Sequence, residues 1–222
     1  MFRSYEDHNE NPILVLGDVL YKLYKISPNP IRLLIRIFLI RTEFEAFSPT
    51  LRRVLSEYHD IHVGLYTIGC FRYINYPPGT NIGRYCMVAN SSLYLGEHHP
   101  TNAKTIHTLF HDSIYGLTDD NLNQFRAPTI EDDVFVGHNV LIYPSVEKIC
   151  TGAMIGSGSV VSKEVIPPYA IVVGNPARVV RYRFSKKTIK DLLDSQWWEK
   201  PLDDLKGSVH EFQVPLEGNE LK

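Results

Sequence analysis

Histidine is the residue type in this chain best suited to acid–base chemistry near neutral pH. The chain has nine histidines, and an unperturbed imidazole, with a pKa of about 6.5, can take a proton from a hydroxyl or ligate a metal. His98 and His99 stand side by side, directly before Pro100, where a repeating pattern breaks off. We therefore interpret one of these two histidines as a general base. A carboxylate to fix its second ring nitrogen is offered by Glu97 or Asp112, and neither is favoured by the sequence alone.

A metal site is the alternative use of these histidines. Metal binding needs three or four converging ligands, and the chain offers five histidines in one region. Two of them stand four residues apart, but threonine follows the first, so the HExxH motif is absent. We therefore expect no metal. The five are His98, His99, His107, His111 and His138.

The element that must position these residues is a repeat of period six. Aliphatic residues recur at Ile130, Val136 and Ile142 and, after one inserted residue, at Ile149, Ile155 and Val161. Residues that tolerate a turn lie three places after each aliphatic, so each unit predicts one short strand and a corner. Three units would close a triangular coil, and stacked coils form an all-β solenoid. A weaker run of the same kind is predicted at Ile68, Ile74, Ile82 and Val88.

The repeat divides the chain into three parts. Residues 1–60 predict a helical extension, residues 61–184 the solenoid with a long loop excursion at about 96–125, and residues 185–222 a C-terminal α-helix and tail. The segment from Ile31 to Ile40 is too short to span a bilayer, and it carries Arg32 and Arg36 on one helical stripe. It predicts a helix packed on the body, with peripheral contact to a membrane surface as the alternative.

Composition limits the classes of partner. The 222 residues carry a net charge of −2, which gives no reason to expect binding to nucleic acid. Three scattered cysteines are too few for a disulfide framework, and the polar first residues do not read as a signal peptide. We therefore expect a cytoplasmic protein.

The motifs of the repeat resemble those of a known family. The stretches IEDDVFVGHNVLI and GSGSVVSKEVIPPYAIVVGNPARVVRYRF, followed by a helix ending in QWW, are similar to the hexapeptide-repeat acyltransferases, in particular to the xenobiotic acetyltransferase branch and its carbohydrate-modifying relatives. The resemblance covers roughly residues 61–205 and leaves the N-terminal quarter outside. It implies a left-handed parallel β-helix, a homotrimer with active sites between subunits, and acetyl-CoA as the acyl donor.

The resemblance also implies roles for individual residues. The family's catalytic histidine stands at the entry to the loop, in many members before proline, which favours His99 over His98 as the base and keeps Glu97 as a candidate partner. Phe110 and Tyr115 of the excursion are candidates for stacking on the acceptor. Phe135 stands where relatives commonly have tryptophan, so acceptor stacking is not assigned there. The residues matching the donor groove are Gly137, Asn139, Ser157, Ser162 and Lys163 along the pantetheine arm, and Arg178 and Arg181 at the phosphates.

These observations favour an acetyl-CoA-dependent O-acetyltransferase acting on a hydroxyl of a carbohydrate, a cell-surface polysaccharide or its precursor. An antibiotic is the alternative acceptor, because the resemblance is to the xenobiotic branch. A γ-type carbonic anhydrase with histidine-held metal is the alternative in another class, although the paired-histidine spacing of that class is absent from the repeat. An inert scaffold would need neither His99-Pro100 nor the NPARVVR stretch.

Overall fold

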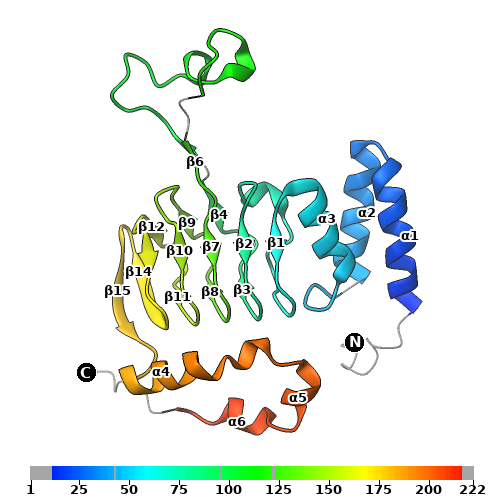
Figure 1. The fold of residues 1–222 in the computed structure, drawn as a ribbon, viewed down its shortest axis with the longest axis vertical. Helices are drawn as coiled ribbons and strands as arrows, with labels where there is room; N and C mark the ends of the chain where they lie inside the picture. Colours follow the sequence, from blue (N-terminus) through cyan, green and yellow to red (C-terminus); the bar gives the residue numbers. More distant parts are fainter. Residues whose placement is uncertain (1–11, 43, 96, 122–123, 217–222) are drawn as a thin grey trace.

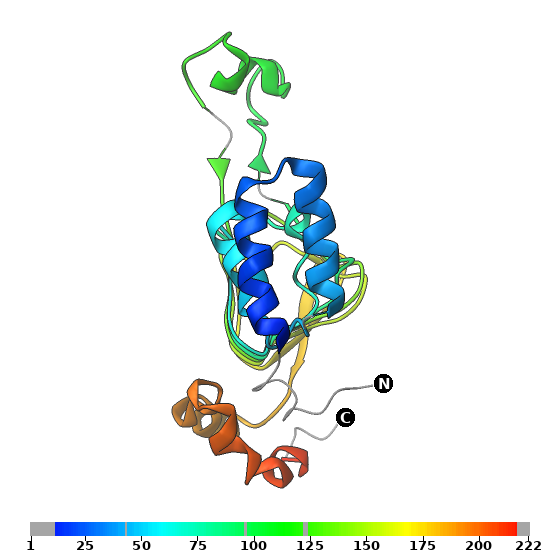
Figure 2. The ribbon, with the colours of Figure 1, turned by 90° about the vertical axis from the view of Figure 1, so that its right-hand side faces the viewer.

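The computed structural model describes residues 12–42, 44–95, 97–121 and 124–216. Its body is a stack of short strands, with helices from the N-terminal part across one end and helices from the C-terminal part along one side (Figure 1). A segment between β5 (Glu97–His98) and β6 (Gln124–Phe125) leaves the body and stands away from it (Figures 1 and 2). We call residues 99–121 the arm and the antiparallel pair β5 and β6 its stem.

Three sheets build the body, and the chain enters them in rotation. All their strands pair in parallel except the last, β15, which returns antiparallel beside β14. Sheet A holds β1 (His62–Val63), β2 (Asn81–Ile82), β7 (Thr129–Ile130), β10 (Lys148–Ile149) and β13 (Val165–Ile166). Sheet B holds β3 (Met87–Val88), β8 (Phe135–Val136), β11 (Met154–Ile155), β14 (Ala170–Gly174) and β15 (Ala177–Tyr182). Sheet C holds β4 (Leu93–Tyr94), β9 (Leu141–Ile142) and β12 (Val160–Val161).

The aliphatic residues of the repeat stack on their equivalents, as the period of six predicts. In sheet A, Ile130, Ile149 and Ile166 lie in one column, and each is at most 1% exposed. Sheets B and C continue the pattern, with Val136 beside Ile155 and Ile142 beside Val161. Burying such side chains contributes about 1.5–3 kcal/mol each, so these columns are the main stabilising element of the body.

The corners between the sheets are of two kinds. Asp133 and Gly152 lie between sheets A and B, Asn139 and Gly158 between sheets B and C, and all four have positive φ. Among the described residues, those at the corners between sheets C and A do not have positive φ. At Gly152 a Cβ would lie 2.4 Å from the ring of Tyr169, so glycine is required there by space as well as by conformation.

The prediction for the weaker first run of the repeat was only half correct. Ile82 and Val88 are buried and stack on the second run as predicted, but Ile68 is partly exposed and Ile74 is 63% exposed. Ile68 forms only an isolated bridge to the outward-facing Met87. Ile74 lies in a 3₁₀ turn, Tyr73–Asn75, that takes the place of a strand at the end of the stack. The prediction of inward positions failed at both residues because the first coil is incomplete.

Three helices, α1 (Pro12–Ile26), α2 (Asn29–Thr42) and α3 (Pro49–His59), pack together at this end, and α3 contacts β1. Ser48 caps α3 by accepting from the amide of Leu51 at 3.0 Å, as the Ser-Pro pair predicts. Arg52 of α3 donates to the carbonyls of five residues between 45 and 67, which fastens the helices to the first coil. Burial lowers the pKa of Arg52 to about 10. Among the described residues, no helix has both the length and the hydrophobicity of a membrane span.

The C-terminal part is more helical than the sequence indicated. The predicted helix is α4 (Lys186–Ser195), capped by Ser185, and it is followed by a 3₁₀ turn, Trp197–Glu199, and by α5 (Leu202–Lys206) and α6 (Val209–Gln213). Trp198 is buried, and Trp197 lies against Tyr85, so both tryptophans pack as expected. An ion pair from Arg84 to Glu199 joins this part to the body.

Candidate active site

The stem brings His99 to the base of the arm. Glu97 pairs with Phe125 and His98 with Gln124, and His99 follows immediately with an exposed side chain. Among the residues that the structure describes, none makes a hydrogen bond to the His99 imidazole. The side chains of Glu97 and His98 lie outside the described part of the chain. The backbone therefore fixes where His99 leaves the body, and its imidazole is open to a ligand.

The interior of the arm is held by its own polar groups. His111 is buried, and its Nε2 lies 2.5 Å from the carbonyl of Thr105. Asp112 and His107 each cap a 3₁₀ turn, Ser113–Tyr115 and Thr108–Phe110, by accepting from backbone amides. Asp112, the second candidate for orienting the catalytic imidazole, thus has a local structural partner within the arm.

The outer surface of the arm is apolar. Phe110 is 59% exposed and Tyr115 is 54% exposed, and Ile114 between them is 79% exposed. These two aromatic rings are the residues proposed to contact an acceptor, and within one chain they pack on nothing that would hide them. They are therefore accessible to a ligand or to a second subunit.

The corners between sheets B and C carry the first group of residues predicted to line the groove of the acyl donor. Gly137 and Ser157 lie one coil apart, and a Cβ at Gly137 would stand 2.6 Å from the Ser157 hydroxyl. The amide of His138 donates to that hydroxyl at 3.1 Å. One coil in the other direction, the Ser91 hydroxyl accepts from the amide of Asn139 at 3.1 Å. The corner column therefore consists of closely stacked backbone in which serine hydroxyls join neighbouring coils.

The corners between sheets C and A carry the second group. Ser162 and Lys163 follow β12, and the carbonyl of Ser162 accepts from the Ser145 hydroxyl at 2.9 Å. Both Ser162 and Lys163 have exposed side chains. Sheet C separates this corner from Gly137, Asn139 and Ser157, so one chain brings the five residues together as two groups and not as one lining.

The two arginines of the NPARVVR stretch lie on β15. Arg178 pairs with Val173 and Arg181 with Ile171 of β14. The guanidinium of Arg178 donates to the carbonyl of Ala177 at 2.9 Å, and that of Arg181 to the carbonyl of Tyr182 at 3.4 Å. Arg178 is exposed at the last coil of the stack, where a phosphate could reach its remaining donors.

Sequence reasoning missed the contact between Ser91 and His138. The Ser91 hydroxyl lies 2.9 Å from His138 Nδ1, and the side chain of His138 is exposed on the corner between sheets B and C. The pairing of Leu93 with Leu141 places residue 91 one coil from residue 139. The register of the repeat across the excursion was the signal that would have found this contact.

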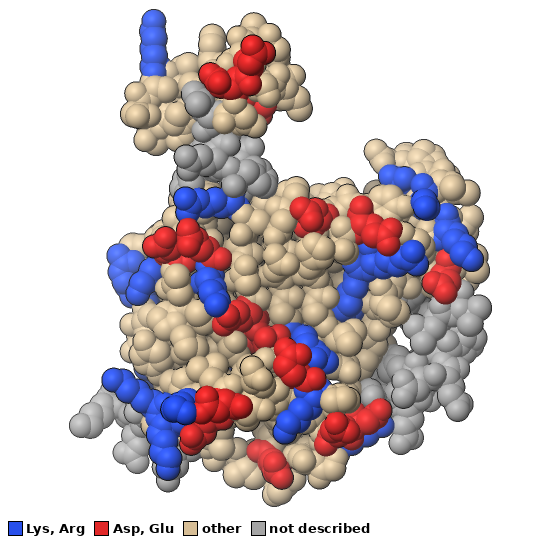
Figure 3. Space-filling view, in the orientation of Figure 1, with Lys and Arg blue, Asp and Glu red and all other residues tan. Residues whose placement is uncertain are grey.

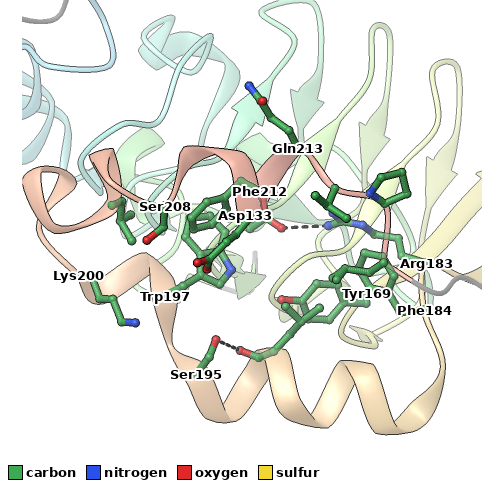
Figure 4. A pocket seen from close by; sticks show the side chains of 16 residues that line it. Asp133, Tyr169, Arg183, Phe184, Ser195, Trp197, Lys200, Ser208, Phe212 and Gln213 are labelled. Carbon is green, nitrogen blue, oxygen red and sulfur yellow. Dashed lines mark hydrogen bonds and ion pairs between the residues drawn. The ribbon is translucent and has the colours of Figure 1, made fainter.

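A cavity of about 630 Å³ lies elsewhere, between the body and the C-terminal helices (Figure 4). Aromatic rings of Tyr169, Phe184, Trp197 and Phe212 line it, together with the Asp133–Arg183 ion pair, whose atoms are 2.9 Å apart. Burial raises the pKa of Asp133 against the opposing effect of Arg183, and burial raises the pKa of Tyr169 to about 12. The C-terminal helices lie on the opposite side of the body from the arm (Figure 1), so this cavity is separate from His99.

The chemistry that the exposed His99 imidazole offers at the candidate site is proton transfer. Within residues 12–42, 44–95, 97–121 and 124–216, no group of three His, Cys, Asp or Glu side chains could hold a metal ion. An exposed imidazole at the base of an apolar arm can take a proton from a bound hydroxyl. The small residues and the cations at the corners are of the types that a long, phosphorylated donor needs.

Comparisons with known proteins agree with this chemistry. A chloramphenicol acetyltransferase of Escherichia coli is 46% identical to this chain over 80 residues, which make up 36% of this chain and 37% of that protein. A probable macrolide acetyltransferase of Lysinibacillus sphaericus is 34% identical over 126 residues, 53% of this chain and 67% of the relative. The chain thus spans 37% of the length of the chloramphenicol acetyltransferases that it matches.

Solved structures include a maltose O-acetyltransferase from Clostridium difficile, which aligns with 79% of this chain and 90% of its own, with 21% identity and a TM-score of 0.44. A galactoside acetyltransferase in complex with coenzyme A aligns with 82% of this chain and 92% of its own, with 20% identity and a TM-score of 0.40. No family model matches the chain.

Proposed function

The chain belongs to the hexapeptide-repeat acetyltransferases, and on that premise we propose that it transfers an acetyl group from acetyl-CoA to a hydroxyl of a carbohydrate. The observation that carries the proposal is the exposed imidazole of His99 at the base of an arm with exposed aromatic rings. In the proposed division of the chain, residues 61–184 carry out acyl transfer, and residues 1–60 and 185–222 flank them. We infer a left-handed coil for the body, as in the family that the chain resembles.

In the proposed mechanism His99 is the general base. Acetyl-CoA supplies the acyl group as a thioester. The imidazole takes the proton of the acceptor hydroxyl as its oxygen forms a bond to the thioester carbonyl carbon, and the imidazolium returns the proton when the carbon–sulfur bond breaks and the thiol leaves. Backbone amides at a corner would stabilise the oxyanion. Glu97 stays the candidate for orienting the imidazole.

The donor groove is proposed along the corners. Ser157 and Gly158 are exposed, and a Cβ at Gly158 would meet no atom within 4 Å, so this corner leaves room for a narrow pantetheine arm. Lys163, Arg178 and Arg181 would meet the phosphates, with Lys163 as a point charge and the arginines as forked donors. The two groups of donor residues would then face one groove across a subunit boundary.

A homotrimer is part of the proposal, and the outer faces of the sheets support it. The outward column of sheet B is apolar, with Met87, Phe135 and Met154, and so is that of sheet C, with Leu93 and Leu141. The outward column of sheet A is mainly polar, with His62, Asn81, Thr129 and Lys148. A prism with two apolar faces and one polar face suits a threefold assembly in which each subunit gives one face to each neighbour.

The acceptor is proposed to be a carbohydrate because Phe110 and Tyr115 offer exposed rings on which a sugar can stack. An antibiotic is the second candidate acceptor, favoured by the chloramphenicol acetyltransferases among the relatives. Three free cysteines, two of them buried, suit a reducing compartment, so we propose a cytoplasmic enzyme.

Calorimetric titration of the metal-free protein with acetyl-CoA, and in parallel with coenzyme A, tests the donor. We expect micromolar binding, followed by release of free thiol when a sugar acceptor is added. Thiol release with chloramphenicol, but with none of the sugars tested, would identify the antibiotic as the acceptor in place of a carbohydrate. Absence of donor binding, together with stoichiometric zinc or iron in elemental analysis of the protein as purified, would overturn the transferase proposal.

A further inference from the structure

The helices α1 and α2 carry apolar residues on the side that faces away from the protein. On α1, Tyr21 and Tyr24 are buried against the body, whereas Leu16, Val19 and Leu23 are exposed. At about 100° per residue these three, with Ile26, form one stripe on the side of the helix opposite the two tyrosines. Ile26 is 80% exposed. Helix α1 is therefore apolar on two opposite sides, one of which has no partner within the described chain.

Helix α2 repeats this arrangement. Its buried residues are Ile35 and Leu39, and on the opposite side Leu33, Leu34 and Ile37 are exposed. Leu34 is 66% exposed. Figure 2 shows α1 and α2 side by side across the end of the molecule, so their outward stripes belong to one surface. We call this surface, made by the outward residues of α1 and α2, the end face.

Basic side chains accompany the apolar stripes. Lys22, Lys25 and Arg41 are exposed on these helices, where Asp18 is the acidic residue. At about 100° per residue, Lys22 and Arg41 lie beside the outward stripes, whereas Lys25 and Asp18 lie farther round α1. Figure 3 shows basic side chains over this end of the molecule. Arg32 and Arg36 of α2 have another function, because their guanidinium groups lie over the rings of Tyr58 and Tyr73.

We propose that the end face docks on the surface of an anionic phospholipid bilayer. Apolar residues in a flat stripe with lysine and arginine at its border are the pattern by which helices lie in the membrane interface, with the apolar side chains among the acyl chains and the cations at the headgroups. The end face presents two antiparallel helices side by side, which suits a planar surface better than a peptide. The charge balance favours an anionic partner over a second copy of this end face, because two such faces would bring like charges together.

Docking in this orientation has a consequence for the rest of the molecule. The end face is perpendicular to the direction in which the coils stack, so the body extends away from the membrane (Figures 1 and 2). In the proposed trimer the three end faces would lie in one plane and bind together, which raises the avidity above that of one subunit. The docking itself is independent of the acetyltransferase proposal, because it uses none of the residues assigned to catalysis or to donor binding.

Co-sedimentation of the full chain with vesicles tests this proposal. We expect binding to vesicles of phosphatidylcholine mixed with phosphatidylglycerol, and binding at least roughly tenfold weaker to pure phosphatidylcholine, because each headgroup-bound cation adds to the affinity. The double variant Ile26→Glu with Leu34→Glu should lose binding to the mixed vesicles by roughly tenfold or more, since both the apolar contact and the charge become unfavourable. Both residues are exposed, so the fold should be retained.

The matched control is Ile74→Glu with Val209→Glu. It adds the same two charges at exposed apolar residues outside the end face and should bind vesicles like the wild type. Equal loss in both double variants would overturn the proposal, because the effect would then be one of net charge. Absence of vesicle binding by the wild type at low salt would also overturn it, and concentration-dependent association abolished by Ile26→Glu with Leu34→Glu would identify a second copy as the occupant instead.

Discussion

Aliphatic side chains are buried in the core of the body and exposed in the arm. In the body, Ile130 and Ile149 stack on each other and are at most 1% exposed. In the arm, Ile106, Ile114 and Leu117 are each at least 60% exposed. A column of stacked coils gives every inward isoleucine a partner above and below, whereas the arm leaves the body after β4 and has no layer to pack against. The apolar core of the body therefore forms within one chain, whereas these apolar side chains of the arm stay exposed in the part of the chain that the structure describes.

This difference separates residues that stabilise from residues that can react. His99 lies at the junction, where the ordered register of the body ends and the exposed surface of the arm begins. The inward residues of the body, such as Ile149, are covered by the neighbouring coils, whereas His99 is exposed. The junction gives His99 both accessibility and a fixed backbone.

Replacing His99 is expected to have the largest effect on activity and almost none on stability. Because the variant would lack a general base, His99→Ala should lower the turnover number for acetyl transfer by about two to four orders of magnitude. The imidazole is exposed, so the free energy of unfolding should change by less than about 0.5 kcal/mol. Steady-state kinetics with release of free thiol measures the first quantity, and urea denaturation the second.

His107→Ala is the control for His99→Ala, because His107 is an exposed histidine of the same arm that caps a local turn. It should keep most of the activity. Wild-type turnover in His99→Ala, with loss in His98→Ala, would move the base to the neighbouring histidine.

The largest effect on stability is expected in the body. Ile149→Ala removes the central member of the column in sheet A, between Ile130 and Ile166, and should cost about 2–5 kcal/mol of unfolding free energy. Ile114→Ala in the arm should change it by less than about 0.5 kcal/mol. Urea denaturation followed by circular dichroism at one protein concentration compares the two. Similar losses in both would contradict the division between body and arm.

The proposed donor groove predicts an intermediate effect. Lys163→Ala combined with Arg178→Ala should raise the dissociation constant for acetyl-CoA roughly tenfold or more, because charged hydrogen bonds to phosphate are lost. Turnover at saturating donor should change little, because Lys163 and Arg178 are proposed to bind the phosphates and not to contact the reacting atoms. Isothermal titration gives the affinity, and Lys187→Ala, an exposed lysine on α4, is the control. An unchanged donor affinity would exclude these corners as the groove.

The sequence predicted the second run of coils better than any other part. A period of six constrains each aliphatic residue twice, through the residue before it and through its equivalent in the next coil, so Ile130, Ile142 and Ile149 were assigned correctly. At Ile68 and Ile74 the sequence has the period of six, but no preceding coil is present to bury the side chains. The pattern carries no information about where a stack ends.

The candidate site was less predictable for a related reason. Contacts within one coil follow from local spacing, but Ser91 and His138 are joined across the excursion, and only the register between the two runs brings them together. The outward stripes of α1 and α2 lay outside the resembling region, and their burial pattern needed the position of α3. Residues whose neighbours are distant in the chain are those that sequence reasoning left undefined.

The smallest predicted effect concerns acid stability at a corner of the body. The carboxylate of Glu131 accepts from the amide of Thr151 at 2.9 Å and forms an ion pair with Lys148. Burial acts to raise the pKa of Glu131, but the hydrogen bonds from Lys148 and Thr151 outweigh it and hold the pKa below its ordinary value of 4.5. The stabilisation is therefore present above pH 4.5 and is lost as the pH falls through the lowered pKa.

Glu131→Gln should remove this dependence. At neutral pH the variant should be less stable than the wild type by about 1 kcal/mol or less, because the partly exposed Lys148 ammonium is screened by solvent. The difference should shrink as the pH falls below 4.5, where the wild-type carboxylate becomes protonated. Thermal denaturation across this pH range measures the effect, with Glu164→Gln, an exposed carboxylate at another corner, as the control. A difference that is constant with pH would mean that Glu131 stabilises the corner through its shape and not through its charge.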